Sequence, residues 1–165
     1  MLLLPQVAAH ADEMFAVLSD PAIYIYENKP PESAAWLRAR FTRLEARASA
    51  DGREQWLNWV LRLATGELIG FVQATIAHDQ SAGIAYVLSS AYWGRGLASE
   101  AVIAMIAELR GQYGVERVTA VLKRENFRSR RLLTRHGFLV DETDMRAELE
   151  VAFDELRMRL ARTPI

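Results

Sequence analysis

A short glycine-containing segment near the middle of the chain restricts the fold more than any other feature of the sequence. It follows the apolar, strand-like run Ile84–Leu88 and has the sequence Tyr-Trp-Gly-Arg-Gly-Leu-Ala-Ser-Glu-Ala over residues 92–101. An apolar helical pattern begins at Leu97 and continues to Leu109. The first backbone N–H groups of a helix have no partner within it, and glycine lets a ligand approach the backbone closely. The segment therefore suits an anion such as a pyrophosphate, although a tight turn without a ligand explains it equally well.

The size and composition of the chain exclude several classes of protein. A length of 165 residues predicts a single domain over residues 1–165. The formal net charge of −1 argues against a nucleic-acid-binding module, and the absence of cysteine excludes disulfides, thiolate metal sites and a cysteine nucleophile. We expect no metal site. The first residues lack a basic region, and no apolar stretch reaches the roughly 20 residues of a membrane helix, so we expect a cytoplasmic protein that does not bind membranes.

The first half of the sequence predicts helices followed by an antiparallel meander. Ser19-Asp20-Pro21 is a helix stop, and Ser33 is a helix cap ahead of an amphipathic pattern. Short polar turns separate three later strands. The predicted elements are a strand over residues 2–4, a helix over 8–18, an irregular segment over 23–31, a helix over 33–44, and strands over 56–63, 68–76 and 82–88.

The second half of the sequence predicts one β-α-β unit and two further strands. The helix over residues 97–109 is closed by Gly111 and Gly114, and a strand over 118–122 runs parallel to the strand before the glycines. A helix over 126–136 and strands over 138–140 and 155–160 follow, whereas residues 143–151 fit a helical turn or an extended arm. The predicted fold class is α/β (α+β), with a mixed, mostly antiparallel sheet of six to seven strands and helices on both faces.

The glycine segment has a second functional interpretation as a dinucleotide-binding loop. The pattern Gly94-x-Gly96-x-x-Ser99 resembles the dinucleotide fingerprint, with Glu125 as a ribose ligand. Against this interpretation, Ser89–Trp93 separate the strand from the first glycine, and serine replaces the third glycine. A P-loop is excluded because no Gly-Lys-Ser or Gly-Lys-Thr triplet follows.

A second motif lies at the start of the last predicted helix. Asn126 and Ser129 share one helix face and could hydrogen-bond the amides of a ligand, although an Asn cap beside a solvated serine is the plainer interpretation. Arg128, Arg131 and Arg135 recur on another face. A solvated stripe explains these arginines best, and a contact with a 3′-phosphate at the rim of a site is the alternative.

Together the two motifs resemble those of the GNAT acetyltransferase superfamily. The fuller string over residues 92–101, with Asn-x-x-Ser and the later His-Gly-Phe, is similar to the Rim-type branch, which acetylates ribosomal-protein N-termini. The segment Leu18-Ser19-Asp20-Pro21 and the late Asp154 are also similar to that branch. The chain departs from the superfamily at Trp93, where most members have Gln or Arg, and at Gly83 and Ala85, where many relatives have Glu and Gly.

The resemblance implies a GNAT-like acyl-CoA N-acyltransferase fold and direct attack of a primary amine on acetyl-CoA in a ternary complex. Backbone N–H groups in the glycine segment would hold the pyrophosphate, and the end of the preceding strand would pair with the pantetheine arm and orient the thioester carbonyl. Asn126 would bond the pantetheine arm, and Ser129 would hydrogen-bond or protonate the leaving thiolate. The implied cofactor-binding residues are Val87, Leu88, Trp93, Gly94, Arg95, Gly96, Leu97, Ala98, Ser99, Asn126 and Ser129.

The acceptor and the general base are less well defined by the sequence. Because Gly83 occupies the slot that is often acidic in relatives, the base stays unassigned, and Glu27, His78 and Asp79 are surface residues that could border the acceptor cleft. Tyr24 and Tyr26 lie in the segment beside the prolines and are the expected substrate contacts, whereas core packing is the expected role of the strand tryptophans, Trp56 and Trp59.

Three functions fit these patterns. The first is an acetyl-CoA-dependent N-acetyltransferase whose acceptor is a protein N-terminus, an amino acid, a polyamine or an aminoglycoside. The second is a non-catalytic module that binds or senses acyl-CoA on the same fold, which the glycine in the acidic slot favours. The third is an NAD-binding oxidoreductase. Members of the Rim-type branch often form dimers, so the resemblance also implies a homodimer as one expectation.

Overall fold

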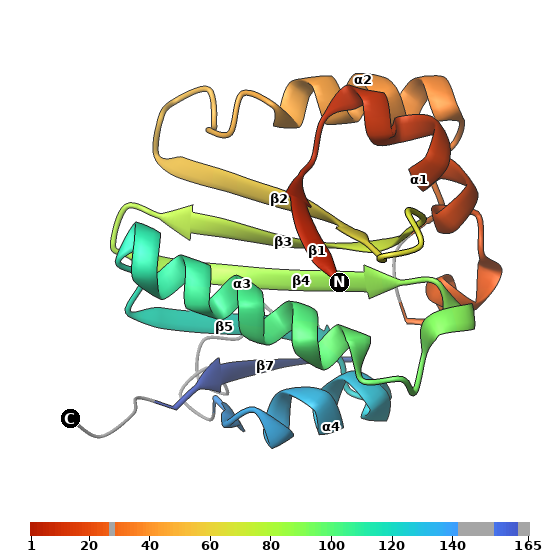
Figure 1. Ribbon diagram of the computed structural model, residues 1–165. Helices are drawn as coiled ribbons and strands as arrows, with labels where there is room; N and C mark the ends of the chain where they lie inside the picture. Colours follow the sequence, from red (N-terminus) through yellow and green to blue (C-terminus); the bar gives the residue numbers. More distant parts are fainter. Residues whose placement is uncertain (27–28, 142–153, 162–165) are drawn as a thin grey trace.

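The computed structural model describes residues 1–26, 29–141 and 154–161 as one mixed seven-stranded sheet with helices packed on both faces (Figure 1). The strand order is β1-β2-β3-β4-β5-β7-β6. Only β4 and β5 pair in parallel. The predicted fold class is therefore confirmed. The strands are β1 (Leu2–Pro5), β2 (Glu54–Arg62), β3 (Leu68–Ala77), β4 (Ser81–Leu88), β5 (Arg117–Lys123), β6 (Phe138–Val140) and β7 (Glu155–Leu160).

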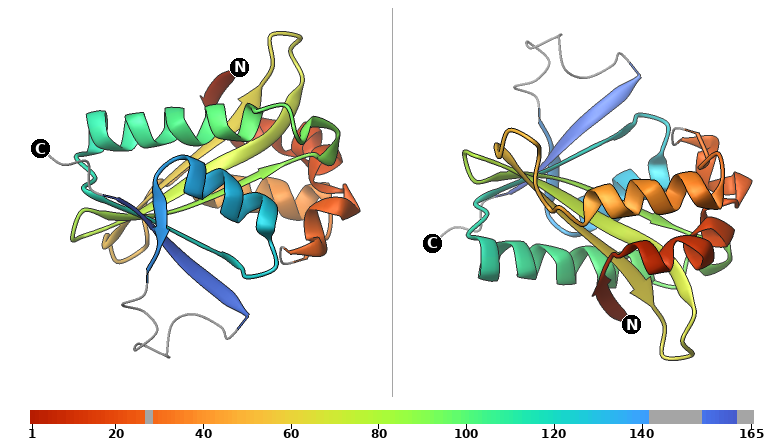
Figure 2. Two further views of the ribbon diagram at one scale, coloured as in Figure 1. Left: turned by 90° about the horizontal axis from the view of Figure 1, so that it is seen from below. Right: turned by 90° about the horizontal axis from the view of Figure 1, so that it is seen from above.

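Four α-helices lie in the described part of the chain, and they divide the core into two hydrophobic clusters. The helices are α1 (Ala11–Leu18), α2 (Ala34–Leu44), α3 (Leu97–Tyr113) and α4 (Phe127–Arg135). One cluster joins α1 and α2 to Val60, Phe71 and Val87 of the sheet, and the other joins α3 and α4 to Leu61, Val72 and Leu88. Because neighbouring strand residues point to opposite faces, β4 contributes side chains to both clusters. Figures 1 and 2 show α2 near β2 and α4 near β7, at opposite ends of the strand order.

The structure differs from the sequence prediction at three helix boundaries. The predicted helix over residues 8–18 is a 3-10 turn over Ala8–His10 followed by α1, and Pro21–Ile25, partly expected to be irregular, form a second 3-10 helix. The Asp20 side chain caps this second helix by accepting a hydrogen bond from Ala22 N at 3.0 Å. α3 runs past Gly111 and ends at Gly114, whose φ of 63° is the left-handed conformation that glycine adopts readily. The undecided segment 143–151 lies outside the described residues.

The parallel pairing of β4 and β5 ends part-way along β4. Ser81–Ile84 pair with Arg117–Ala120, after which β5 continues alongside β7 through Lys123. The second half of β4, Ala85–Leu88, therefore has a strand partner only on its β3 side in the described part of the chain. The gap between the two diverging strands exposes backbone groups that a ligand can reach, and it positions the site described next.

Candidate active site

The glycine segment forms a tight loop that presents free backbone donors. Gly94 and Gly96 have φ values of 75° and 80°, and Gly96 directly precedes α3. Within the part of the chain that the structure describes, the first N–H of this helix to bond backward is that of Glu100, which donates to Gly96 O at 3.0 Å. The N–H groups of residues 94–99 are therefore available to an anionic ligand at the positive end of a 17-residue helix.

The arginines of α4 lie across a cavity from this loop. Arg128, Arg131 and Arg135 line the same cavity of about 460 Å³ as residues 96–99. The guanidinium carbon of Arg128 lies 3.8 Å from the centroid of the Trp93 ring, a cation–π contact that fixes the side chain at the cavity wall. These arginines are exposed, as expected for a solvated stripe. They also line the cavity that the glycine loop lines.

Trp93 closes the end of β4 as well as holding Arg128. Its Nε1 donates to the Leu88 carbonyl at 2.9 Å, so that carbonyl has one lone pair left for a ligand. The substitution of Trp for the Gln or Arg of the superfamily pattern therefore has a structural use here. The indole stabilises the turn out of β4 and supplies an aromatic face for the neighbouring arginine.

A hydroxyl pair lies in the cleft beside the free half of β4. The Tyr86 hydroxyl and Ser129 Oγ are 2.6 Å apart, and the Ser129 N–H donates to Asn126 Oδ1 at 3.0 Å. All three residues line a cavity of about 210 Å³ together with Val87 and Leu88. The predicted motif residues Asn126 and Ser129 are thus brought together with the end of β4, and Asn126 is also the helix cap that the plainer interpretation expected.

Sequence reasoning missed Tyr86. Strand alternation was the signal that could have found it, because Ile84, Tyr86 and Leu88 point to the same face and both of its neighbours are buried there. Pairing with a serine on α4 depends on how far β5 diverges from β4, and the local sequence does not encode that divergence.

Asp20 ties the N-terminal helices to the start of the glycine loop. Its Oδ2 accepts a hydrogen bond from Ser90 N at 2.7 Å. Hydrogen bonds from the side chain and backbone of Ser90, with a smaller contribution from Ala22, hold the pKa of Asp20 below its ordinary value. The carboxylate is therefore an ionised clamp between the 3-10 helix after α1 and the loop after β4.

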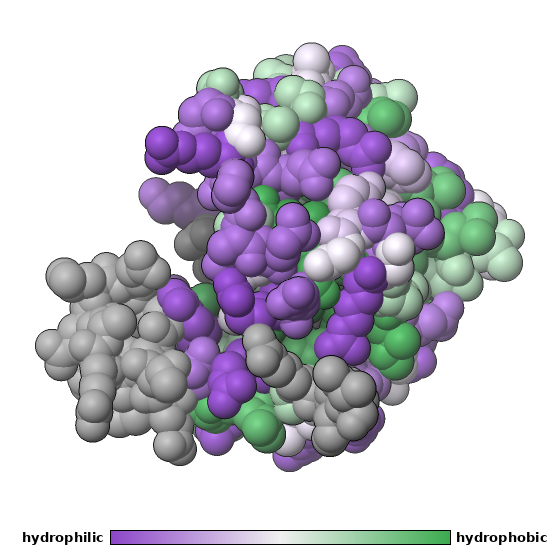
Figure 3. All heavy atoms as spheres, turned by 90° about the vertical axis from the view of Figure 1, so that its left-hand side faces the viewer, coloured by the Kyte–Doolittle hydropathy of each residue, from purple (hydrophilic) through white to green (hydrophobic). Residues whose placement is uncertain are grey.

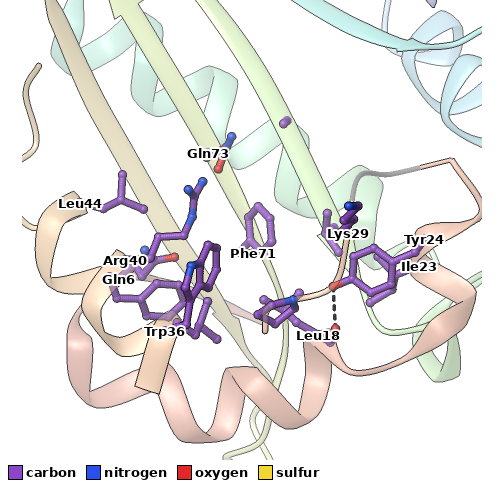
Figure 4. Close-up of a pocket in the computed structure, with 15 residues that line it drawn as sticks. Gln6, Leu18, Ile23, Tyr24, Lys29, Trp36, Arg40, Leu44, Phe71 and Gln73 are labelled. Atoms are coloured by element: carbon purple, nitrogen blue, oxygen red, sulfur yellow. Dashed lines mark hydrogen bonds between the residues drawn. The ribbon is translucent and has the colours of Figure 1, made fainter. Parts of the chain in front are cut away.

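A second cavity lies on the α1–α2 face of the sheet. It has a volume of about 310 Å³, and Ala85 and Val87 of β4 line it. Figure 4 shows other residues that line it, among them Phe71 and Gln73 of β3. Ile23 and Val87 line both this cavity and the cleft of Tyr86 and Ser129, so the two spaces meet at β4. This cavity is called the acceptor-side cavity below.

The two tyrosines expected to contact substrate lie in different places. Tyr24 lines the acceptor-side cavity, and its hydroxyl donates to the Leu18 carbonyl at 2.6 Å (Figure 4). Tyr26 lines the cleft of Tyr86 and Ser129 instead. Of the strand tryptophans, Trp59 is buried as expected, but Trp56 is only partly buried and borders a further groove.

Two of the residues considered as a general base, His78 and Asp79, lie away from the cleft. His78 and Asp79 occupy the β3–β4 turn, eight or more residues from Val87 and so about 25 Å away along an extended strand. Figure 3 shows the end of the molecule that carries this turn, and its described surface is mostly hydrophilic. Asp79 accepts hydrogen bonds from Ser81 and contacts Arg117, and the Ser81 bond is the main reason its pKa lies below its ordinary value. Glu27 lies outside the described residues.

Two further findings bear on the site. Among the described residues, no cluster of three or more His, Cys, Asp or Glu side chains is arranged to hold a metal ion. The described helices include none that is both long enough and apolar enough to cross a membrane.

Comparison with known proteins identifies the family. Residues 1–139 match the family described as acetyltransferase (GNAT) domain. A search of curated proteins found no match. Among solved structures, spermidine N-acetyltransferase from Vibrio cholerae in complex with CoA and spermine superposes with a TM-score of 0.78 at 18% identity, over 98% of this chain and 95% of that one.

A second structure is more similar in sequence. A GnaT-family acetyltransferase from Bordetella pertussis superposes with a TM-score of 0.71 at 25% identity, over 96% of this chain and 94% of that one. The family match spans most of the chain, and the splayed strands, glycine loop and α4 motif all lie in the matched region or at its border. The chain belongs to the GNAT acetyltransferase family.

Proposed function

We propose that the protein is an N-acetyltransferase that moves the acetyl group of acetyl-CoA to a primary amine by direct attack in a ternary complex. One observation carries the proposal: the cleft of Tyr86 and Ser129 is continuous with the glycine-loop cavity through Leu88, Trp93 and Ala98, and with the acceptor-side cavity through Val87. A thioester in that cleft could therefore meet an amine arriving from the opposite face of β4.

The cofactor-side residues fit acetyl-CoA. The backbone N–H groups of residues 94–99, from Gly94 through Arg95 to Ser99, suit the pyrophosphate, and the α4 arginines at the same cavity suit a 3′-phosphate. The exposed backbone of β4 between Ala85 and Leu88 suits the amides of a pantetheine arm in the manner of an added strand. The Asn126 amide lies beside this path. Its Oδ1 accepts a hydrogen bond from Ser129 N, and its Nδ2 is the group proposed to donate to the pantetheine arm.

The positions of these groups support the following proposed reaction. The amine nitrogen bonds to the thioester carbonyl carbon, the C–S bond breaks, and the sulfur leaves with the electron pair of that bond. A backbone N–H near Val87 stabilises the developing oxyanion, an interaction worth roughly 3 kcal/mol in comparable sites. Ser129 Oγ donates a hydrogen bond or its proton to the leaving thiolate, and the Tyr86 hydroxyl replaces that proton through the 2.6 Å contact and takes one back from water.

The proton of the amine leaves by another route. Gly83 is exposed and occupies the slot that is often acidic in relatives. Because glycine has no side chain, this position supplies no base. An amine of pKa above about 8 then loses its proton to water or arrives neutral. Holding both reactants in contact supplies much of the acceleration, since proximity effects reach about 7–11 kcal/mol.

Several finer expectations belong to the same proposal. The motifs around residues 92–101 and the Asp20 clamp support a Rim-type acetyltransferase acting on protein N-termini. A small-molecule amine, such as the spermine bound in the Vibrio cholerae structure, is the other acceptor class. We also propose that residues 1–165 form a single domain that works in the cytoplasm, that no nucleic acid is bound, and that a homodimer is the expected assembly.

A non-catalytic acyl-CoA sensor is the second function, and the exposed Gly83 favours it. One experiment separates the two. Acetyl-CoA is incubated with the protein and a panel of primary amines (peptide N-termini, amino acids, spermidine and an aminoglycoside), and the released thiol is measured. Thiol release that depends on one class of amine is expected for the enzyme. Binding of acetyl-CoA with no thiol released by any amine would contradict catalysis and support the sensor.

A further inference from the structure

We propose that the acceptor amine carries an anionic group, a carboxylate being the best fit, about two peptide residues from the reacting nitrogen. This inference rests on the proposed function and narrows its acceptor class. It excludes polyamines and aminoglycosides as the favoured substrates and selects peptides or peptide-like amines with an acidic group near the N-terminus.

The acceptor-side cavity carries positive charge. Lys29 and Arg40 line it, and the described residues that form its wall include no carboxylate side chain (Figure 4). Neither cation forms an ion pair with a carboxylate in the described part of the chain; the guanidinium of Arg40 instead lies 5.8 Å from the centroid of the Trp36 ring. Both positive charges are therefore available to a ligand.

A second space, a groove, continues from this cavity and is also positively charged. Arg40 lines both spaces, and Arg43 adds a second guanidinium to the groove beside Trp56. The described lining of the groove also lacks carboxylates. The nearby Glu54 accepts a hydrogen bond from the Trp56 indole at 2.9 Å and does not line the groove.

Side-chain amides also line the acceptor-side cavity and the groove. Gln73 lies between Asn58 and Ala85 in the strand register and lines both spaces, so its amide can donate to an anionic oxygen beside Arg40. Gln6, only 9% exposed, also lines the acceptor-side cavity, but its Nε2 is a buried atom without an acceptor among the described residues, so Gln73 is the amide donor that this inference uses. A wall rich in donors and cations matches an oxygen-bearing anion.

The same features disfavour a polycation. A polyamine brings two or more ammonium groups, and its second charge would lie beside Lys29 and Arg40 with no described carboxylate to balance it. The solved spermidine acetyltransferases do not weigh against this inference, because identities of 17–18% show the shared fold alone.

The strand register gives the spacing between amine and anion. Val87, where the two spaces meet, pairs with Phe71, so Gln73 is its diagonal neighbour across β3 and β4. Diagonal cross-strand residues are about 7–8 Å apart, which corresponds to about two residues of extended peptide. An amine at Val87 therefore places a second-residue or third-residue carboxylate near Gln73 and Arg40.

The experiment compares matched acceptors. Initial rates of thiol release are measured for the tripeptide amides Ala-Glu-Ala and Ala-Gln-Ala, which differ by one charge, and for spermidine. We expect kcat/KM for the glutamate peptide to exceed that for the glutamine peptide by about tenfold, and spermidine to be the poorest acceptor. In the Arg40→Gln variant the preference for glutamate should fall to about twofold. The control Arg110→Gln, which changes an exposed arginine in the last turn of α3, should leave the preference intact.

The outcomes separate this inference from the proposed function. Turnover that is fastest with spermidine, or equal for the two peptides and insensitive to Arg40→Gln, overturns the inference and leaves the acetyltransferase intact. Absence of thiol release with every acceptor, in a protein that binds acetyl-CoA, overturns both.

Discussion

In the proposed function, the two faces of β4 serve different partners by different means. On the face of α3 and α4, the groups offered to a ligand are mainly backbone N–H groups of residues 94–99 and the hydroxyls of Tyr86 and Ser129. On the face of α1 and α2, they are side chains from separate elements: Lys29, Arg40 and Gln73. β4 belongs to both faces and separates the two cavities by the thickness of one strand.

This difference explains which half of the site can vary. A backbone cradle recognises the phosphates that every CoA carries, and it requires only glycines and a helix start in the right place. Side-chain donors on α2 and on the segment before it can change without disturbing that cradle. The proposed function therefore makes acceptor choice adjustable on the α1–α2 face, while the chemistry of thioester attack stays on the other.

The largest effect on stability is expected at Gly70 of β3, which lies against β4, the strand that both faces share. A Cβ at Gly70 would lie 2.1 Å from the Val87 carbonyl oxygen, so Gly70→Ala forces β3 and β4 apart. We expect the free energy of unfolding to fall by about 3 kcal/mol in urea denaturation. Gly83→Ala on the neighbouring strand is the matched control, since a Cβ there meets no atom within 4 Å, and it should change stability by less than about 1 kcal/mol. Equal stability of the two variants would refute the close approach at Val87.

The hydroxyl pair tests whether the chemistry is confined to one face. Ser129→Ala should lower kcat about tenfold and Tyr86→Phe about fivefold, with the Kd for acetyl-CoA within a factor of about two, because a thiolate leaving group of pKa about 8.5 needs only modest help. Tyr24→Phe removes a hydroxyl from the other face and should leave kcat for a fixed acceptor within about twofold. Unchanged turnover in the Ser129 and Tyr86 variants would remove the pair from the mechanism.

The smallest expected effect on stability is that of Asp20, which links the N-terminal helices to the loop after β4. This effect depends on pH because the Asp20 carboxylate titrates. The pKa of Asp20 is lowered from 3.8, so its stabilising contribution is complete above that pH and is lost as the pH falls through the folded-state pKa. Asp20→Asn should reduce the free energy of unfolding by about 1 kcal/mol at pH 7. The difference between wild type and variant should shrink below pH 3.8 in urea titrations. A difference that is constant from pH 7 to pH 3 would show that the charge of Asp20 contributes nothing.

The cofactor face was largely predictable from the sequence. The strand, glycine loop and helix are adjacent in the chain, and the spacing of Asn126 and Ser129 on one helix face follows from helical geometry. Local rules therefore predicted that Asn126 and Ser129 share one face, and Tyr86, whose hydroxyl contacts Ser129, was missed. The helix ends were less predictable: Gly111 did not stop α3, because an exposed glycine inside a long packed helix lowers stability without breaking it.

The acceptor face was not predictable in the same way. The side chains of Gln6, Lys29, Arg40 and Gln73 come from segments up to 67 positions apart in the numbering, 6 to 73, and only the packing of α2 over the sheet brings them together. The tyrosines chosen from local composition separated into different cavities, and His78 and Asp79 were not brought to the cleft. Nothing in the local sequence encodes which polar side chains end up facing one space.

Titration calorimetry with acetyl-CoA tests the central claim most directly, because every role assigned to the cofactor face requires binding at the glycine loop. We expect one site per chain. We also expect Gly96→Asp, which places a carboxylate among the free N–H groups at a φ of 80°, to weaken binding by at least about a hundredfold. Gly66→Asp, at a left-handed glycine in the β2–β3 turn with φ 98°, should bind as the wild type does. No heat of binding at millimolar acetyl-CoA, or wild-type affinity in a folded Gly96→Asp variant, would contradict the account.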